Sequence, residues 1–262
     1  MPSEQTTAIV GYGHVGRQTH RLFPNSVVHD LVPMADSVDR AAVNACTVAF
    51  VCVPTPALPS GAADLTAIED VFGWLTSSLA VIRSTVPPGT TERIASARDR
   101  AAVVWPEFIG QWAQSRPTLL EVLGFPAALV GGLPSDRRTL VALLAPALGA
   151  ETRIIQASAR TVELAKYMEN AWLAMQVVFV NEFFDLATEL DIDYWELREL
   201  WLADPRIPRT HTVVQQSRGF SGRCLPKDLD ALLSLARDSG VGVPLLESIR
   251  SSNRRWSQGR PT

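Results

Sequence analysis

The feature that most constrains the fold is a glycine-rich turn between a short apolar run and a helix-forming stretch. Thr7–Val10 leads directly into the sequence G-Y-G-H-V-G at residues 11–16. In a strand–turn–helix unit, the first glycine permits a tight turn and the second lets the backbone approach a diphosphate. The third lets the helix pack closely on the strand, and the free amides at the helix start face the anion. The predicted dinucleotide contacts in this turn are Gly11, Gly13, His14, Val15 and Gly16.

A carboxylate follows the second predicted strand, Ser26–His29. Asp30 could bind the ribose hydroxyls of a dinucleotide and would repel the additional 2′-phosphate of NADP, so the predicted cofactor is NAD. The alternative is a glycine-rich turn accompanied by an unrelated surface aspartate. We favour the cofactor site because strand, turn, helix and acid occur in the register that a dinucleotide-binding domain requires.

Short β-branched runs alternate with helix-forming stretches in the first part of the chain. This pattern predicts an α/β fold, a Rossmann-like doubly wound parallel sheet with helices on both faces. From about residue 159 the chain is rich in Ala, Leu, Glu and Met, which favour helices. We expect an NAD-binding domain at residues 1–158 and a smaller all-helical domain at residues 159–262. The expected strands are Thr7–Val10, Ser26–His29, Thr47–Val53, Ala80–Arg83, Ala102–Trp105, Ala127–Val130 and Thr152–Ile155. The expected helices include Leu65–Leu75, Asp136–Leu148, Arg160–Leu190 (one helix or two in line), Tyr194–Leu202, Leu229–Ser239 and Pro244–Trp256.

Composition excludes several classes of function. The 262 residues are 47% hydrophobic and 19% charged with a net charge of −3, and no broad basic face indicates nucleic acid as a partner. No apolar segment reaches the roughly 18 residues that span a bilayer, and we expect neither a membrane segment nor a signal peptide. Three cysteines without metal-ligand spacing predict reduced thiols in the cytoplasm and no metal site.

The three cysteines differ in their surroundings. Cys46 and Cys52 lie in or beside the apolar run Thr47–Val53, which predicts core positions. Cys224 instead follows a glycine-containing loop, and the flanking Arg223 and Lys227 would lower its pKa and favour the nucleophilic thiolate. Cys224 is therefore the candidate for covalent chemistry.

Other polar groups occur where a ligand could meet them. Residues 53–56 (V-P-T-P) and 84–91 (S-T-V-P-P-G-T-T) follow buried strands, at the edge where doubly wound sheets bind ligands. Glu163, Lys166 and Asn170 share one face of a helix whose neighbouring residues are apolar. A cation there could stabilise an alkoxide or a tetrahedral oxyanion. The alternative is a Glu–Lys pair on a solvated helix face.

Taken in order along the chain, these motifs resemble the UDP-glucose/GDP-mannose dehydrogenase family. The family pattern continues after the glycine turn with V-P-T-P, S-T-V-P-P-G-T, P-E-F, E-x-x-K-x-x-x-N, N-E, R-I and G-x-G-G-x-C-x-P-K-D. This chain has each motif, at residues 53–56, 84–90, 106–108, 163–170, 181–182, 206–207 and 219–228, with Ser221 replacing one glycine. The resemblance implies that two successive hydride transfers to NAD oxidise a primary alcohol to an acid through a thioester, in a homodimer.

The resemblance also implies roles for individual residues. Cys224 would attack the intermediate aldehyde, and Lys166 and Asn170 would stabilise the oxyanion. Asp228, with Thr85, would hold a water molecule, and Glu107 is a candidate base for thioester hydrolysis. Pro54, Thr55 and Thr85 are expected at the cofactor, Gly222, Arg223 and Lys227 at the substrate, and Arg206 at the substrate of a partner subunit.

The sequence departs from the family pattern in features that are expected to affect substrate recognition. The chain stops after the helix that carries Asn253, where the family continues into a nucleotide-binding third domain. The interval between Asp30 and residues 53–56 is shorter than usual, and Gln111 replaces an acid. Arg223 adds a cation before the nucleophile, which either binds a phosphate or carboxylate or faces solvent. The expected substrate is a small-molecule alcohol: a sugar or nucleotide sugar, or a smaller acidic or phosphorylated alcohol.

Two other classes of function stay open at this point. A two-electron hydroxyacid-type dehydrogenase would use Lys166 and Asn170 but not Cys224. A non-catalytic NAD-binding relative of the family would need none of these residues. The number of NADH molecules formed per product distinguishes the three classes.

Overall fold

The structure, a computed structural model, describes residues 6–32, 36–108 and 127–257, and it divides into two compact units. The first unit comprises Met1–Thr55 and Asp64–Lys166, and the second comprises Pro56–Ala63 and Tyr167–Thr262. The expected domain boundary at residue 158 lies just before helix α7 (Ala159–Glu189), whereas the two units divide within this helix. α7 therefore contributes residues to both units.

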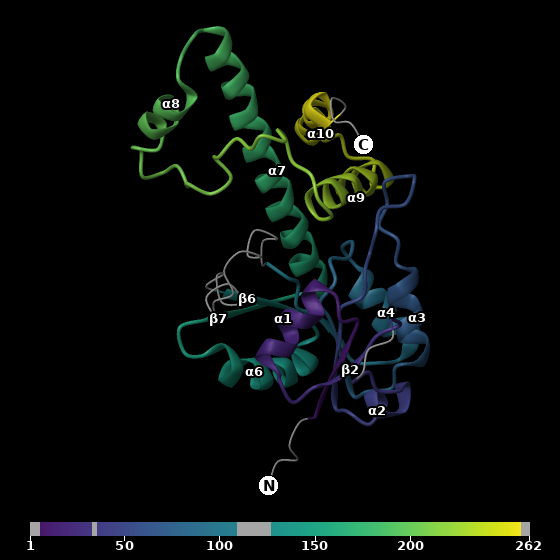
Figure 1. Cartoon of the computed structure of the whole chain (residues 1–262). Helices are drawn as coiled ribbons and strands as arrows, with labels where there is room; N and C mark the ends of the chain where they lie inside the picture. Colours follow the sequence, from purple (N-terminus) through teal and green to yellow (C-terminus); the bar gives the residue numbers. More distant parts are fainter. Residues whose placement is uncertain (1–5, 33–35, 109–126, 258–262) are drawn as a thin grey trace. The chain divides into compact units, whose positions relative to one another are not determined.

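A seven-stranded sheet forms the centre of the first unit (Figure 1). The strand order is β2-β1-β3-β4-β5-β6-β7, so the chain leaves β1 toward one edge and then returns to continue toward the other. The loops after β1 and β3 flank the point of reversal, where doubly wound sheets bind ligands. The strands are β1 (Thr7–Val10), β2 (Val27–His29), β3 (Val48–Val51), β4 (Leu79–Ile82), β5 (Ala102–Val104), β6 (Ala127–Gly132) and β7 (Arg153–Ala157).

One strand pair runs antiparallel in the otherwise parallel Rossmann-like sheet that the sequence predicts. β5 and β6 pair antiparallel, with Val103 opposite Gly132, while the other neighbouring strands pair parallel. A buried strand presents the same apolar run whichever way it points. The sequence therefore predicted the strands but not this direction.

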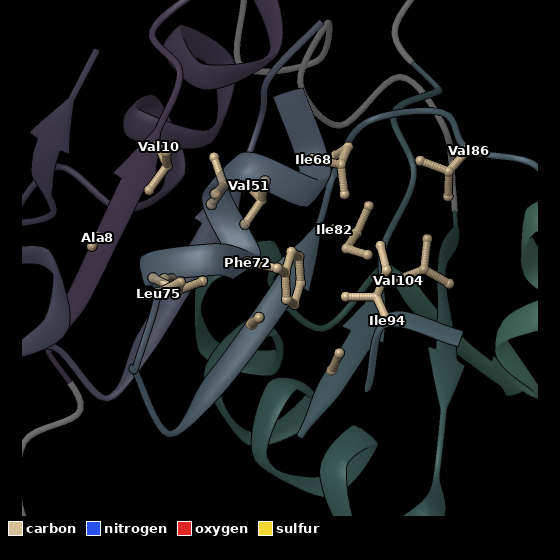
Figure 2. Packing of buried hydrophobic residues seen from close by; sticks show 14 of the residues in the cluster. Ala8, Val10, Val51, Ile68, Phe72, Leu75, Ile82, Val86, Ile94 and Val104 are labelled. Atoms are coloured by element: carbon tan, nitrogen blue, oxygen red, sulfur yellow. The ribbon is translucent and has the colours of Figure 1, made fainter. Parts of the chain in front are cut away.

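Alternate strand residues enter two apolar clusters on opposite faces of the sheet. Ala8 and Val10 pack in a cluster with α2 (Arg40–Asn44), α3 (Thr66–Trp74) and α4 (Thr90–Arg98), part of which is shown in Figure 2. The intervening Ile9 packs with the other cluster, which includes residues of α1 (His14–Leu22) and α6 (Pro134–Leu148). This is the three-layer arrangement that the alternation of strands and helices predicts. α2 and α4 were not predicted, because α2 is short and α4 begins with a threonine-rich turn without apolar periodicity.

The second unit is helical. α7 is one uninterrupted helix of 31 residues, and it is followed by α8 (Tyr194–Trp201), α9 (Leu225–Asp238) and α10 (Pro244–Ser257). One apolar cluster joins α7, α9 and α10, and a second joins α7 to α8. α9 begins four residues before its predicted start, since Pro226 is tolerated in a first helical turn. Among the described helices, none has both the length and the apolar character that crossing a bilayer requires.

Candidate active site

The glycine turn after β1 has the geometry that its sequence predicts. Gly11 has a φ of +91°, and a Cβ there would lie 2.9 Å from the carbonyl oxygen of Cys52. A Cβ on Gly16 would lie 2.0 Å from the carbonyl oxygen of Gly11, so α1 can approach the strand only without a side chain. A Cβ on Gly13 would meet no described atom within 4 Å. Gly13 therefore leaves open space at the start of α1.

Two further groups at this turn fit a dinucleotide. His14 Nε2 is buried and has no hydrogen-bond partner among the described residues, so one tautomer can donate to a phosphate oxygen. Asp30 follows β2, and its carboxylate accepts hydrogen bonds from the backbone amides of Tyr12 and Val32. Asp30 thus fixes the glycine turn and also brings a negative charge to it.

The loops after β3 and β4 are joined by side-chain hydrogen bonds. Ser84 Oγ donates to the carbonyl oxygen of Val53 at 2.6 Å, and Thr55 Oγ1 donates to the carbonyl oxygen of Thr85 at 2.8 Å. The predicted cofactor residues Pro54, Thr55 and Thr85 therefore lie on two adjoining loops at the carboxyl edge of the sheet.

Glu107 forms a buried ion pair with Arg83, a partner that the sequence motifs did not indicate. Arg83 Nη2 lies 2.9 Å from Glu107 Oε2, and the Arg83 guanidinium stands 3.6 Å from the centroid of the Trp105 ring. Burial lowers the pKa of Arg83, and the negative charge of Glu107 opposes that shift. The Glu107 carboxylate is thus held beside the Arg83 guanidinium. The sequence feature that could have indicated this pair is Arg83, a charged residue directly after the apolar strand β4. Gln111, four residues after Glu107, lies outside the described residues.

In the first turns of α7, the structure excludes the alternative that Glu163 and Lys166 form a pair on a solvated helix face. Glu163 and Lys166 are both buried. The carboxylate of Glu163 accepts hydrogen bonds from the amides of Gly89 and Thr91 and from Thr91 Oγ1. Lys166 Nζ stands 4.6 Å from the centroid of the Phe108 ring, in the segment that follows β5. Lys166 is therefore a buried cation beside the P-E-F motif.

In the second unit, three predicted site residues come together. Asn170 Nδ2 donates to Asp228 Oδ2 at 2.5 Å, and Lys227 Nζ lies 2.6 Å from Asp228 Oδ1. Asn170 and Asp228 are buried. Asp228 thus orients an amide donor and a cation with its two oxygens.

Cys224 has an exposed side chain and occupies the N-cap position of α9. Its carbonyl oxygen accepts a hydrogen bond from the amide of Asp228 at 2.9 Å, in the first turn of the helix. A helix N-terminus favours a thiolate over a thiol. Arg223 is exposed, and within the described part of the chain its guanidinium forms no ion pair. Gly222 has a φ of +87°, which permits the turn into the helix.

The loop before Cys224 is held by residues whose role the sequence did not indicate. Asn253 of α10 accepts a hydrogen bond from the amide of Phe220 and donates one to its carbonyl oxygen. A Cβ on Gly219 would lie 2.5 Å from Asn253 Oδ1. Arg218 donates to Asn181 and pairs with Asp185, both on α7. These contacts fix the loop on two helices of its own unit.

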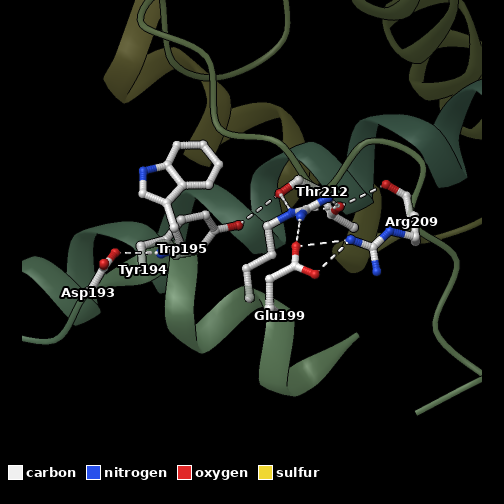
Figure 3. Close-up of polar contacts among 7 residues, drawn as sticks. Asp193, Tyr194, Trp195, Glu199, Arg209 and Thr212 are labelled. Carbon is white, nitrogen blue, oxygen red and sulfur yellow. Dashed lines mark hydrogen bonds and ion pairs between the residues drawn. The ribbon is translucent and has the colours of Figure 1, made fainter. Parts of the chain in front are cut away.

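Arg206 lies in the segment after α8, and a polar network joins α8 to Arg209 and Thr212 later in this segment (Figure 3). The hydroxyl of Tyr194 donates to the carbonyl oxygen of Thr212 at 3.0 Å, and Glu199 pairs with Arg209 at 2.7 Å. Arg206 itself is exposed and pairs with Asp204 at 2.6 Å. The structure thus presents Arg206 on the surface of the second unit.

The fold and these groups define a class of protein: a dinucleotide-binding domain followed by a helical domain that carries polar and nucleophilic side chains. Comparison with known proteins identifies the family. Residues 33–109 match the NAD binding domain of the UDP-glucose/GDP-mannose dehydrogenase family, and residues 160–255 match its central domain. The chain belongs to this family, as its motifs predicted, and it contains the family's NAD binding domain.

Individual relatives agree with this assignment. The chain is 31% identical over 231 residues to the UDP-glucose 6-dehydrogenase of Pseudomonas aeruginosa. This match covers 80% of this chain and 49% of the relative. The chain is 29% identical over 236 residues to the GDP-mannose 6-dehydrogenase of Pseudomonas putida. This match covers 83% of this chain and 52% of the relative. The chain thus spans about half the length of the curated relatives it matches.

Solved structures share the fold. A UDP-glucose dehydrogenase from Pyrobaculum islandicum matches with a TM-score of 0.83 at 24% identity, covering 97% of this chain and 70% of that one. A 3-hydroxyisobutyrate dehydrogenase from Mycobacterium tuberculosis matches with a TM-score of 0.73 at 20% identity, covering 97% and 94%. At these identities the likeness establishes the Rossmann-like architecture and its helical partner.

Proposed function

We propose that this protein is an NAD-dependent dehydrogenase that oxidises a primary alcohol to a carboxylate in two steps, with Cys224 as the covalent nucleophile. The observation that carries the proposal is the exposed thiol at the start of α9, in the same unit as the buried Asn170–Asp228–Lys227 group. Membership of a dehydrogenase family supports the class of reaction.

The glycine turn and its neighbours fit NAD. The open space at Gly13 and the unsatisfied His14 Nε2 suit the diphosphate, and Asp30 suits the ribose hydroxyls. Bound nicotinamide would accept the hydride that each oxidation releases. The residues proposed to hold the cofactor are Gly11, Gly13, His14, Val15, Gly16, Asp30, Pro54, Thr55 and Thr85.

The chain's own residues would provide the remaining chemistry. Lys166 and Asn170 would stabilise negative charge on the substrate oxygen, an effect worth about 2.7–4 kcal/mol per well-placed donor. The Cys224 thiolate would add to the aldehyde carbon and form a thiohemiacetal. Loss of the second hydride and of the hydroxyl proton would leave a thioester.

Hydrolysis would complete the reaction. Water would attack the thioester carbon, the carbon–sulfur bond would break, and the thiolate of Cys224 would leave. Glu107, which pairs with Arg83, is the proposed base that takes the proton from this water. Asp228, with Thr85, is proposed to hold the water.

We propose an alcohol that also carries an anionic group. Arg223 precedes the nucleophile and has no ion-pair partner among the described residues, so its guanidinium is available to a phosphate or carboxylate. Gly222 and Lys227 are proposed beside it. Arg206, exposed on the segment after α8, is proposed to reach the substrate of a partner subunit in a homodimer. The three cysteines form no disulfide in the structure, which suits a reducing cytoplasm.

The test is the number of NADH molecules formed per molecule of acid. Nucleotide sugars, sugar phosphates and small hydroxy acids should be screened by NADH absorbance, and the wild-type protein should form two NADH for each acid. Cys224→Ser should bind NAD normally, but it should release the aldehyde or retain a stable ester, because an alkoxide is a poorer leaving group than a thiolate. Cys46→Ala removes a thiol from the first unit and serves as the control.

Other outcomes identify the alternative functions. One NADH per product, with no effect of Cys224→Ser, would indicate a two-electron hydroxyacid-type dehydrogenase that relies on Lys166 and Asn170. NAD binding without turnover of any alcohol would indicate a non-catalytic member of the family. Mass spectrometry of a single turnover should detect an acyl adduct on the peptide that contains Cys224 if the proposal is correct.

A further inference from the structure

We propose that Glu163 is a positioning residue that holds the Ser84–Thr91 loop against the first turns of α7, so that Thr85 and Lys166 keep a fixed spatial relation. The inference rests on the proposed function, in which Thr85 and Lys166 serve the reaction. All the residues involved belong to the first unit.

Three hydrogen bonds carry the inference. Glu163 Oε2 accepts from the amide of Gly89 at 2.6 Å, and Oε1 accepts from the amide and the hydroxyl of Thr91 at 2.9 and 2.6 Å. Gly89 precedes α4 with a φ of +91°, and these amides are donors that the start of a helix leaves unsatisfied. Glu163 therefore caps α4 with a side chain from another helix, more than seventy residues away in sequence.

The connection between Glu163 and Thr85 is short and stiff. Thr85 stands four residues before Gly89, and the intervening Pro87 and Pro88 have fixed φ angles. On its other side the loop is held by Thr55, which donates to the carbonyl oxygen of Thr85. A displacement at Gly89 would therefore be transmitted to Thr85.

The connection between Glu163 and Lys166 is one helical turn. Lys166 is buried and rests against the ring of Phe108, so its position depends on where this end of α7 is fixed. A second contact between the same elements is weaker: Arg160 pairs with Glu92 at 3.1 Å, with both side chains largely exposed. Glu163 is only 1% exposed, so its hydrogen bonds are the buried contact that attaches α7 to the Ser84–Thr91 loop.

The carboxylate is retained at an energetic cost. Burial raises the pKa of Glu163, and its hydrogen bonds to Thr91 and Gly89 lower it only in part. Glutamine has nearly the same shape, but its NH₂ group would face an N–H or O–H donor where Glu163 presents an acceptor. Glu163→Gln therefore loosens the loop attachment without opening a cavity.

The experiment compares Glu163→Gln, Thr91→Val and the double variant with Glu92→Gln as the matched control. Glu92 lies in the first turn of α4 and pairs with Arg160 of α7, but it is exposed. Amide hydrogen exchange of Gly89 and Thr91 reports on the attachment, and single-turnover formation of NADH reports on positioning. Thermal unfolding of each variant identifies any loss of folded protein.

We expect faster exchange at Gly89 and Thr91 in Glu163→Gln, and a kcat lower by about 100-fold, the cost of displacing a reacting group by roughly 1 Å. The loss should fall on kcat more than on KM, and the effects of Glu163→Gln and Thr91→Val on kcat should be non-additive. Glu92→Gln should behave as wild type. A purely structural role would lower the unfolding temperature and leave the kcat of the folded protein unchanged, which would overturn the proposal.

Unchanged exchange in Glu163→Gln would overturn the proposal as well. A wild-type protein that oxidises none of the alcohols would contradict the proposed function instead. In that case the exchange comparison would still decide whether Glu163 holds the loop.

Discussion

At the scale of single residues, Asp30 serves two purposes. Its two carboxylate oxygens accept hydrogen bonds from the amides of Tyr12 and Val32, so it organises the turn that it also charges. Removing the side chain would disturb both functions together. Asparagine removes the charge while its amide oxygen keeps one of the two hydrogen bonds, and its NH₂ group would face the other backbone amide.

We predict that the wild-type protein binds NAD⁺ more tightly than NADP⁺, and that Asp30→Asn narrows the difference. The loss of charge repulsion against the 2′-phosphate should raise the ratio of NADP⁺ to NAD⁺ affinity by roughly tenfold, equivalent to about 1.4 kcal/mol. Calorimetric titration of the wild type and the variant with each cofactor measures these affinities. Equal or tighter binding of NADP⁺ by the wild type would show that Asp30 does not select the cofactor.

At the scale of elements, α7 exposes large apolar side chains that a partner could bury. Large apolar side chains at helical spacing lie exposed along one stripe of the helix: Met168, Trp172, Phe179, Phe183 and Leu186. The rings of Phe179 and Phe183 lie 4.7 Å apart within this stripe. An exposed stripe of this kind is typical of an interface, and we propose a second copy of the chain as the partner.

We predict a dimer at micromolar concentration in sedimentation velocity, and a monomer for Phe183→Glu, which would place a charge within the proposed interface. Thr188→Glu adds the same charge to another exposed face of α7 and should leave the dimer intact. A monomeric wild type would contradict the prediction and would also remove the role proposed for Arg206 in a partner subunit.

At the scale of the whole molecule, the three thiols differ in burial and therefore in reactivity. Burial raises the pKa of Cys52 to about 12 and also raises that of Cys46, so both remain protonated well above neutral pH. Cys224 is exposed at the start of a helix. Because the thiolate is the reactive form, only Cys224 should be modified by an alkylating reagent under native conditions.

We predict a single adduct when the folded protein is treated with iodoacetamide at pH 7–8, on the peptide that contains Cys224. Unfolding in urea should expose all three cysteines, because the shifts at Cys46 and Cys52 arise from burial. Intact-mass measurement before and after unfolding provides the comparison. Rapid native modification of Cys52 would contradict the packing of the first unit.

The sequence by itself determined the features that depend on local spacing. The glycine turn, the strand and helix periods and the order of the motifs each lie within a short stretch, and they predicted the Rossmann-like fold and the family. The extent of α9 was predicted less well, since Pro226 looked like part of the loop although a first helical turn accepts it. The roles of the site residues remain predictions for the experiments above.

Only the tertiary structure decided what depends on partners distant in sequence. The antiparallel pairing of β5 with β6, the ion pair of Arg83 with Glu107 and the attachment of Glu163 to Gly89 and Thr91 are of this kind. Local sequence patterns do not specify which polar groups become buried together. Burial removes water from these groups and makes an unmatched charge or donor costly, so folding selects the partners that satisfy them.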